Sequence, residues 1–447
     1  MRQALLLFPT GALGADLVNR RVAGLQLLDR QVRTLARAGI DHISVVLPAE
    51  AHPKLTELTQ KLPVQLEFVS HGAAPTLPEP QSPYLLLMAE YAHHHTSLSE
   101  WIARVKSDAI LVAHATSPPR QKGPQRAALP GLIEAPQTTV SSGAFYCQPD
   151  HLAPASFSAA EDPWSLLAQI ESEALRFDES AHALWARVDL SGGPRAAKNM
   201  LFSQVTKTTS GFVSRHINAR LSIPTSKLLV ETGLSPHAIT VLLVLTTGLY
   251  SAYLVSMAQQ YSTLLIGGIL WQLAAVFDRC DGEVARVKLC ESKFGAWFDT
   301  VTDNIAYLCG YIGTLVGMNR LHDGDPLYAY VGASSIAAMF MTLFVMYNYA
   351  RKTGSGSLQH YLRALSQEVH EEEKSWVQKL MERYGFVAKR DFFSFYVFLA
   401  CAANQLALVY WFLVTVLHLA AAAVLLSQRK MMRSHSRLQQ REGTEGE

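Results

Sequence analysis

The chain has 447 residues, enough for two or three domains, and a net charge of +2. A charge so close to balance gives no sign of a nucleic-acid partner, and we expect none. A mean hydropathy of +0.11 with only 17% charged residues argues against an ordinary cytosolic enzyme of this length. The five cysteines form no CxxC pair, which argues against a disulfide framework or a structural zinc site.

Short apolar runs alternate with amphipathic stretches in the first half of the chain, which predicts an α/β domain with a mainly parallel sheet. A helix is expected over 23–38, where leucines recur at helical spacing before Gly39. A second helix is expected over 162–174, and a proline-rich surface loop over 116–135. The predicted strands are 4–8, 43–48, 64–69, 84–88, 110–113 and 139–147.

The segment 201–235 alternates apolar and basic residues. This pattern is typical of an amphipathic helix lying at the headgroup level of a membrane. An ordinary linker helix between two domains is the alternative.

Six apolar segments follow, each close to the roughly 20 residues that cross a bilayer core. They are 236–257, 261–284, 293–318, 326–350, 391–408 and 410–428, with the last boundary expected near 407–411. Lysine and arginine are concentrated in alternate connections. We therefore expect an integral protein of the cell membrane with six spans, and with both termini and the active site on the cytoplasmic side.

The predicted fold is therefore an N-terminal α/β, Rossmann-like domain followed by an all-α bundle of six transmembrane helices. We expect the cytosolic domain over 1–200, the amphipathic segment over 201–235 and the transmembrane domain over 236–430. A polar tail occupies 431–447, and its residues from 434 on are expected to be disordered.

Four aspartates lie at the junction of the second and third apolar segments, where carboxylates are costly unless they bind something. Their spacing places two sets of residues on the facing sides of two antiparallel helices. Four carboxylates would then meet in a pocket suited to one or two hard cations. The first set is Asp278, Asp281, Gly282 and Ala285, and the second is Gly295, Asp299 and Asp303.

The small residues and a nearby arginine indicate a nucleotide beside these cations. Gly282 and Ala285 leave their helix face bare, so that a nucleotide can approach the backbone closely. Arg286 stands where its guanidinium can form a forked contact with a phosphate. A buried ion-pair network is the alternative, with the cations Arg279, Arg286, Lys288 and Lys293 nearby.

This spacing resembles the signature of the CDP-alcohol phosphatidyltransferase family at each of its fixed positions. The matching pattern is Asp278-x2-Asp281-Gly282-x2-Ala285-Arg286-x8-Gly295-x3-Asp299-x3-Asp303. The resemblance implies six transmembrane helices, a homodimer, and a metal-dependent transfer of a substituted phosphate from a CDP-alcohol to an alcohol, with release of CMP.

The resemblance also implies a role for each matching residue. Mg²⁺ or Mn²⁺ is held by Asp278, Asp281 and Asp299, and Asp303 is a further metal ligand, the catalytic base, or both. The donor nucleotide contacts Asp278, Gly282, Ala285, Arg286 and Gly295.

The substrates remain open. Arg351, Lys352 and Arg390 either bind the phosphate of a phospho-alcohol acceptor or only anchor the topology. The donor is either a CDP-lipid such as CDP-diacylglycerol, which gives a phospholipid, or a soluble CDP-polyol such as CDP-inositol, which gives a polyol phosphodiester. Membrane lipids are expected partners.

The whole chain resembles bifunctional inositol-1-phosphate cytidylyltransferase/di-myo-inositol-phosphate-phosphate synthase proteins, through the run SGFVSR at 210–215 and the segment 24–40. This implies a nucleotidyltransferase-like N-terminal domain. The residues that should carry cytidylyl transfer depart from that pattern. Asp16 stands near the place of a basic residue, Glu90 follows the central strand where an aspartate belongs, and the triplet 93–95 cannot direct three histidines at one ion. We expect a domain that keeps the fold, has lost this chemistry, and keeps a binding or dimer-organising role.

Two other classes of function are alternatives. The first is a membrane-anchored nucleotide-binding scaffold, or pseudoenzyme, without turnover. The second is a transporter, which the clustering of the acidic residues at the cytosolic end of the spans disfavours.

Overall fold

In the computed structural model, the chain forms two compact units. The first unit comprises Met1–Val205 and two later segments, Lys227–Gly233 and Arg286–Cys290. The second unit comprises Thr206–Ser226, Leu234–Ala285 and Glu291–Glu447. The described residues are 2–51, 53–75, 77, 81–105, 111–116, 140–150, 152–159, 166–167, 175–179, 184–189, 191–206, 211–353 and 390–444.

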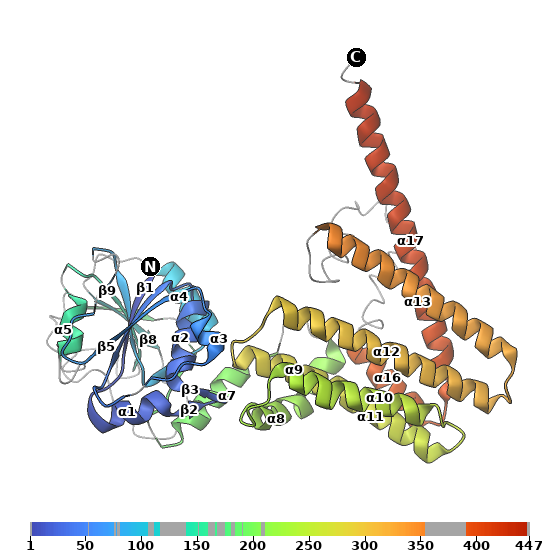
Figure 1. Ribbon diagram of the computed structural model, residues 1–447, viewed down its shortest axis with the longest axis horizontal. Helices are drawn as coiled ribbons and strands as arrows, with labels where there is room; N and C mark the ends of the chain where they lie inside the picture. Colours follow the sequence, from blue (N-terminus) through green and yellow to red (C-terminus); the bar gives the residue numbers. More distant parts are fainter. Residues whose placement is uncertain are drawn as a thin grey trace. The chain divides into compact units, whose positions relative to one another are not determined.

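The first unit is built on a seven-stranded sheet in the order β10-β8-β9-β6-β1-β4-β5 (Figure 1). Every neighbouring pair is parallel except the two that involve β9, so the predicted, mainly parallel α/β sheet is confirmed. The strands are β1 (Gln3–Leu7), β4 (His42–Leu47), β5 (Gln65–Ser70), β6 (Tyr84–Met88), β8 (Leu111–Thr116), β9 (Val140–Cys147) and β10 (Leu175–Glu179).

Four short strands of the first unit were not predicted. They form two small antiparallel pairs, and each strand has only two or three residues, too few for an alternating pattern to show. They are β2 (Arg21–Val22), β3 (Leu25–Gln26), β7 (Tyr91–His93) and β11 (Trp185–Arg187).

Helices cover both faces of the sheet, with α2 and α4 on one side and α5 on the other (Figure 1). The helix predicted from residue 23 begins only at Leu27, because Ala23 and Gly24 take positive φ angles of 47° and 78° in the β2–β3 turn. The predicted helix 162–174 and loop 116–135 fall largely outside the described residues. Within the described part of this unit, the helices are α1 (Gly11–Asn19), α2 (Leu27–Arg37), α3 (Glu57–Gln60), α4 (His95–Arg104), α5 (Pro154–Ala159) and α7 (Gly193–Ser203).

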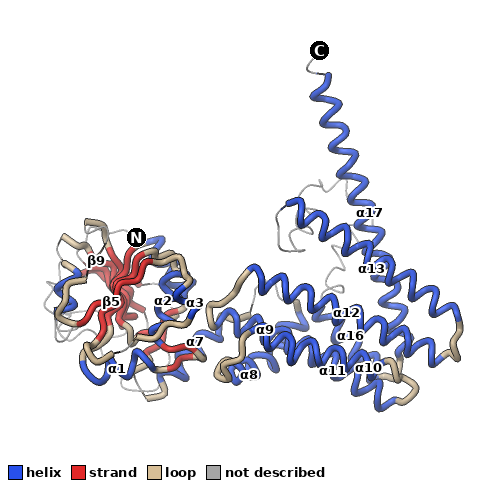
Figure 2. The backbone as a smooth tube through the Cα atoms, viewed as in Figure 1, coloured by secondary structure: helices blue, strands red, loops and turns tan. Residues whose placement is uncertain are grey.

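The second unit is helical throughout its described part, as the predicted all-α bundle requires (Figure 2). Its connecting helices are η2 (Ser214–Asn218) and α8 (Ala219–Leu229), where η marks a π-helical segment. A continuous helical stretch follows as α9 (Pro236–Ile239), η3 (Thr240–Leu245) and α10 (Thr246–Val255). The remaining helices in the described residues are α11 (Tyr261–Val287), α12 (Lys293–Leu321), α13 (Pro326–Thr353), α16 (Arg390–Ala402) and α17 (Leu406–Thr444).

Four stretches of the described chain are long and apolar enough to cross a membrane: Pro236–Val255, Tyr261–Val287, Pro326–Val345 and Leu406–Leu425. Helix α12 is long enough at 29 residues but is not among them. It carries Asp299 and Asp303 at one end and Arg320 at the other, which lowers its hydropathy. Helix α16 has only 13 residues. The count of six spans therefore stays a prediction.

Two predictions about the last helices are wrong. The break between α16 and α17 lies at 403–405 rather than 407–411, because Asn404 ends α16 with a positive φ of 57° while the Gln405 amide donates to the Ala400 carbonyl at 2.8 Å. The tail expected to be disordered from residue 434 continues α17 as far as Thr444. Its leucine, glutamine, arginine and glutamate residues are good helix formers, and this local preference prevails.

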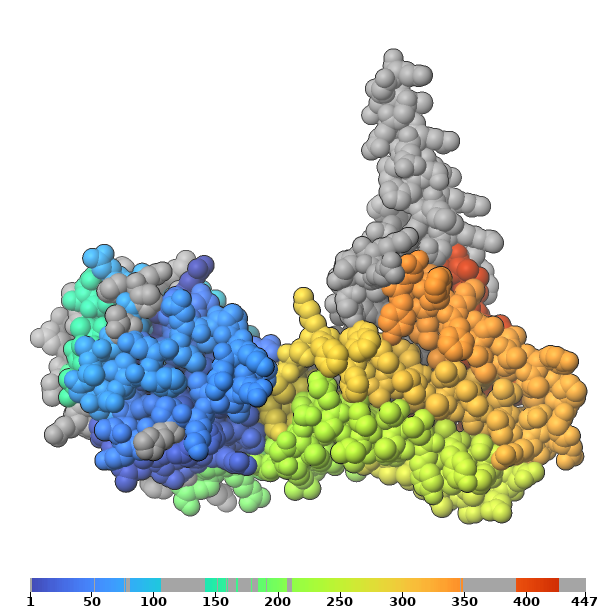
Figure 3. All heavy atoms as spheres, viewed as in Figure 1, coloured from blue at the N-terminus to red at the C-terminus, as the bar shows by residue number. Residues whose placement is uncertain are grey.

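Glycines let α12 pack closely against α10. A Cβ atom on Gly313 would lie 2.3 Å from the Ala252 carbonyl oxygen, and one on Gly317 would lie 2.6 Å from that of Val255. Small residues at such spacing are the usual means of close helix packing in membranes. Figure 3 shows α10, α12 and α13 forming one continuous surface of the second unit on this face.

The connecting segment α8 presents its apolar side chains outward. Leu228 is 73% exposed, and Phe212 just before η2 is 74% exposed. Ser222 and Ser226 of the same stretch are fully buried. Such an outward apolar side is what a helix at the headgroup level of a membrane needs, and this role stays a proposal.

Candidate active site

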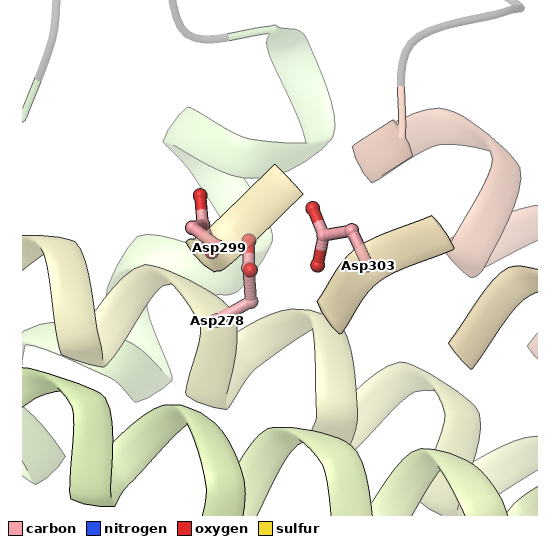
Figure 4. A group of neighbouring side chains, drawn as sticks. All are labelled: Asp278, Asp299 and Asp303. Carbon is pink, nitrogen blue, oxygen red and sulfur yellow. The ribbon is translucent and has the colours of Figure 1, made fainter. Parts of the chain in front are cut away.

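Three of the four predicted aspartates meet in the second unit. Asp278 comes from α11, and Asp299 and Asp303 come from successive turns of one face of α12. One carboxylate oxygen from each lies within 4.8 Å of the others, and Figure 4 shows the three side chains grouped between the two helices. All three are partly buried. Among the described residues, this is the one cluster of three side chains found suited to a metal ion.

The donor set fits a hard divalent cation. Carboxylate oxygens are the ligands that Mg²⁺ and Mn²⁺ prefer, and the three lie close enough to bind one ion. Three like charges this close repel each other unless a cation or protons neutralise them. The chemistry of the cluster therefore agrees with the metal site predicted from the sequence.

The fourth aspartate, Asp281, is engaged elsewhere. It lies one turn beyond Asp278 on α11, is only 6% exposed, and is not part of the three-carboxylate group. Thr240 Oγ1 donates a hydrogen bond of 2.5 Å to its Oδ2. Thr240 is the first residue of the π-helical segment η3, and such segments are frequent at functional sites.

The first turn of α12 is fixed by a cap and by close packing. Ser292 Oγ accepts a hydrogen bond of 2.9 Å from the Gly295 amide, as expected of an N-cap residue. A Cβ on Gly295 would lie 3.2 Å from His237 Cε1, so this position favours glycine for packing as well as for any contact with a nucleotide. The His237 ring also meets Phe298 edge to face.

A buried network holds α8 against α11, one turn beyond the aspartates. Glu283 is fully buried and accepts hydrogen bonds of 2.8 Å from both Ser222 and Ser226. Arg279 pairs with the same carboxylate at 2.9 Å and also contacts Ser214. Arg279, one of the cations considered for an ion-pair network, therefore pairs with Glu283.

The remaining predicted nucleotide residues are spread along α11. Gly282 and Ala285 are half-buried in the second unit. Arg286 belongs to the first unit, where its Nε donates to the Val205 carbonyl at 3.0 Å. Contacts of these residues with a donor stay predictions.

The predicted acceptor residues occupy helix ends. Arg351 and Lys352 lie in the last turn of α13, and Arg390 is the first residue of α16. Their side chains lie outside the described part of the structure, so their role stays a prediction.

The histidine triplet of the first unit does not form a chelating group in the described structure. His93 is buried at the end of β7. His94 instead caps α4, with its Nδ1 2.7 Å from Thr96 Oγ1. The rings of His94 and His95 stack on each other. The expectation that these side chains do not serve one ion agrees with this arrangement.

A cavity of about 590 Å³ opens from the aspartates into the helical bundle. Its lining includes Asp299, Asp303, Tyr311 and Thr314 of α12. The stretch from Asp299 to Thr314 is about 22 Å long at the helical rise of 1.5 Å per residue. Among the described residues that line it, the charged ones are the three aspartates at one end. The rest of the wall is largely apolar and aromatic, and includes Trp271, Tyr307, Phe393, Val397, Phe412 and Leu413.

Sequence reasoning missed two features of this site. Nothing in the sequence indicated a role for Thr240, because a threonine in an apolar helix forms no distinctive pattern. Part of the cavity wall could have been predicted, since Tyr307 and Tyr311 continue the spacing of Asp299 and Asp303 at intervals of four along the same helix face.

Comparison with known proteins identifies the segment that contains the site. Residues 234–416 match the model of the CDP-alcohol phosphatidyltransferase family. The chain is 31% identical over 175 residues to a bifunctional IPC transferase and DIPP synthase of Thermococcus kodakarensis, a match that covers 38% of this chain and 37% of that protein. The chain thus matches well under half of the length of that relative.

Two further similarities reach the first unit. A bifunctional IPC transferase and DIPP synthase of Rubrobacter xylanophilus is 28% identical over 355 residues, covering 74% of this chain and 78% of that protein. The solved structure of the inositol-1-phosphate CTP transferase from T. maritima covers 47% of this chain and 98% of its own, with 13% identity and a TM-score of 0.33.

The matched segment contains all four aspartates of the signature and both helices that bring three of them together. The predicted family is confirmed for this part of the chain: residues 234–416 are a CDP-alcohol phosphatidyltransferase domain.

Proposed function

We propose that the chain transfers a substituted phosphate from a CDP-linked donor to the hydroxyl of an alcohol, releasing CMP. The observation that carries this proposal is the meeting of Asp278, Asp299 and Asp303 within 4.8 Å inside the family-matched segment. A metal-binding carboxylate cluster beside a large cavity is the arrangement that such a transfer needs.

Asp278 and Asp299 would hold Mg²⁺ or Mn²⁺ together with Asp303. A bound divalent ion supplies neutralisation of the diphosphate charge as CMP departs. Asp281 would support this set from its position beside Thr240, whose hydroxyl donates to its carboxylate and fixes its orientation.

Asp303 would act as the base. It accepts the proton of the acceptor hydroxyl while the hydroxyl oxygen attacks the β-phosphorus of the donor. A new oxygen–phosphorus bond forms, the bond from that phosphorus to the oxygen of the CMP phosphate breaks, and CMP leaves with the electron pair. Asp303 suits this role because it lines the cavity next to Asn304 and Tyr307, where an acceptor can enter.

The cavity favours a substrate with an apolar part. Its wall beyond the aspartates is largely apolar and aromatic, and the burial of a polyol against such a wall would leave hydroxyls without partners. An acyl or alkyl chain along α12 would gain about 0.8 kcal/mol per buried methylene. Of the two donors left open, CDP-diacylglycerol or another CDP-lipid is therefore the one we propose.

The membrane setting belongs to the same proposal. Four apolar helices of spanning length and the matched family support an integral membrane protein. Six spans, cytoplasmic termini, a homodimer and contacts with membrane lipids agree with this function. Cysteine accessibility at the termini and the mass of the detergent-solubilised particle would test them.

The direct test is CMP release by the purified full-length protein. We expect release with CDP-diacylglycerol and a panel of alcohol and phospho-alcohol acceptors in the presence of Mn²⁺. Asp303→Asn should reduce the rate by about 10²–10⁴-fold, the usual contribution of a positioned base. Asp323→Asn, in the exposed turn after α12, is the matched control and should keep the wild-type rate.

Each other outcome is informative. Release from CDP-inositol but not from CDP-diacylglycerol would reject the lipid donor and keep the reaction. If folded protein binds CDP compounds but turns over none across the panel, the chain is instead a nucleotide-binding scaffold.

A further inference from the structure

The segment Arg286–Cys290 joins the two aspartate-bearing helices, yet it belongs to the first compact unit. Two arginines of α2 contact its backbone. Arg30 donates from Nη1 to the Val287 carbonyl at 2.9 Å, and Arg33 donates from Nη1 to the Lys288 carbonyl at 2.7 Å. We call Arg30, Arg33 and these two carbonyls the arginine clamp.

Both guanidinium groups are buried, and each of their nitrogens donates a hydrogen bond. Arg30 is 1% exposed and also donates to the carbonyls of Val22 and Ala23, at 3.0 and 3.1 Å. Burial, and secondly the charge of Arg33, lowers the pKa of Arg30 to about 9, so it stays a cation at neutral pH. A buried cation is tolerated only where acceptors surround it, and the Val287 carbonyl is one of its three.

Arg33 is also buried and has partners besides the Lys288 carbonyl. It is 4% exposed and donates to Thr59 Oγ1 at 2.8 Å and to Thr56 Oγ1 at 2.7 Å. Asp29 lies 3.4 Å away and neutralises its charge. These contacts with Thr56, Thr59 and Asp29 fix the orientation of the Arg33 guanidinium independently of its bond to the Lys288 carbonyl.

The clamped carbonyls are those that most need donors. Val287 is the last residue of α11, and the final carbonyls of a helix lack intrahelical partners and carry the negative end of its dipole. Leu289 follows with a positive φ of 51°, which an L-residue with a large side chain rarely adopts. The surroundings must hold this turn in place.

The turn between β2 and β3 contacts the same region. A Cβ on Gly24 would lie 2.0 Å from the Val230 carbonyl oxygen and 3.0 Å from Lys288 Cε. Val230 belongs to Lys227–Gly233, the connection between α8 and α9, which is also part of the first unit. Lys198 of α7 pairs with Glu231 of this connection at 3.1 Å. Both segments, Lys227–Gly233 and Arg286–Cys290, therefore make these contacts within the first unit.

The geometry points to a positioning role of the first unit in the transferase reaction, a role that rests on the proposed function. We propose that Arg30 and Arg33, through the arginine clamp, fix the end of α11 and the turn to α12. They thereby set where Asp278 stands relative to Asp299 and Asp303. Asp278 precedes the clamp by about 13 Å of continuous helix, at 1.5 Å per residue, so a shift at the clamp is carried to the carboxylate. This role needs no nucleotide chemistry in the first unit.

The test uses the purified full-length protein with Arg30→Met and Arg33→Met, each of which removes the charge and the donors. Arg37→Met, on the exposed end of the same helix, is the matched control. The measured quantities are Mn²⁺ affinity without substrate, by electron paramagnetic resonance, and then kcat and KM for CMP release. We expect kcat to fall about tenfold to a hundredfold, as for small misplacements of catalytic groups. We also expect Mn²⁺ affinity to fall at least about fivefold, with KM for the donor changed less.

Partial variants keep the proposal testable if a methionine variant does not fold. Arg33→Lys keeps the charge but replaces the three guanidinium nitrogens by one ammonium nitrogen. Thr59→Val removes the hydroxyl that accepts from Arg33 Nε and that lies 3.1 Å from Thr56 Oγ1, and leaves Arg33 itself unchanged. Both should fold and show a smaller loss of Mn²⁺ affinity than full removal of the clamp, but a greater loss than Arg37→Met. If the folded variants keep Mn²⁺ affinity and kcat within twofold of wild type, the positioning role is wrong. If wild type releases no CMP, the proposed function fails. The Mn²⁺ affinities of the variants would then still show whether the arginine clamp positions the aspartates.

Discussion

Thr240 Oγ1 donates a hydrogen bond of 2.5 Å to Asp281 Oδ2, and both residues are buried. This bond joins the π-helical segment η3 to the aspartate-bearing face of α11. It explains why Asp281 is not grouped with the three aspartates that meet between α11 and α12. It also predicts that a threonine outside the family signature matters for the site.

Replacement of Thr240 by valine should reduce CMP release about tenfold, because a buried carboxylate then loses a donor worth about 1.5–3 kcal/mol. The control is Thr246→Val in α10, whose hydroxyl donates only to the Leu242 carbonyl of its own helical stretch. Initial rates at saturating Mn²⁺ check the prediction. Equal rates for the two variants would show that the Thr240 bond has no part in the site.

Narrowing the cavity should discriminate between donors. Thr314 lines the cavity about 22 Å along α12 from Asp299, and Thr314→Leu should raise the KM for a long-chain CDP-lipid about tenfold through lost space. A CDP-lipid with short chains should be affected less. Thr415→Leu is the control, since Thr415 is exposed and not part of the lining. A uniform loss across chain lengths would contradict a lipid chain in this cavity.

His94 should make the stability of the first unit depend on pH. Burial, followed by the charges of His95 and Arg30, lowers the pKa of His94 to about 4 from its ordinary 6.5. The unfolded chain therefore takes up a proton near pH 6.5 and the folded chain only near pH 4. Stability is complete above about pH 6.5 and falls as the pH drops toward 4, by about 1–3 kcal/mol because solvent screens the partly exposed ring.

The variant His94→Asn isolates this effect, because asparagine keeps an N-cap acceptor for α4 without titrating. Thermal unfolding of the full chain at pH 7 and pH 4.5 should show a smaller difference for the variant than for wild type. The same difference in both proteins would assign the pH dependence to other groups.

Elements marked by a regular pattern of apolar residues could be predicted from the sequence. Strands such as β6 match within a residue or two, since a buried apolar run between turns has few other readings. The start of α2 could not be predicted, because Ala23 and Gly24 are apolar or small and fit a helix until the β2–β3 turn is seen. The end of α16 at Ala402, followed by Asn404 with its positive φ, could not be predicted either, because it lies within an almost unbroken apolar region.

The candidate site also has a part that the sequence predicts and a part that it does not. Helical spacing alone places Asp299 and Asp303 together and brings Asp278 opposite them. It could not separate Asp281 from this group, because the partner Thr240 is about 40 residues away in the chain. The arginine clamp was also hidden, since Arg30 and Arg33 have the usual appearance of solvent-exposed helix residues.

The first unit should not catalyse cytidylyl transfer. After β1 the chain enters helix α1 at Gly11 in place of a glycine-rich phosphate loop, and Arg20 pairs with Asp16 and donates to the Val188 carbonyl. The full chain should release no diphosphate from CTP above the uncatalysed rate with inositol 1-phosphate present. CMP release by the same preparation shows that the protein is active. Sustained diphosphate release would contradict the loss of this chemistry.

The most direct test of the metal site is Mn²⁺ binding to the purified, folded protein, measured by electron paramagnetic resonance with and without a CDP-lipid. We predict that wild type binds Mn²⁺, that the CDP-lipid tightens this binding, and that Asp299→Asn weakens it at least about tenfold. Wild-type protein that is folded yet binds neither Mn²⁺ nor the CDP-lipid would contradict the account.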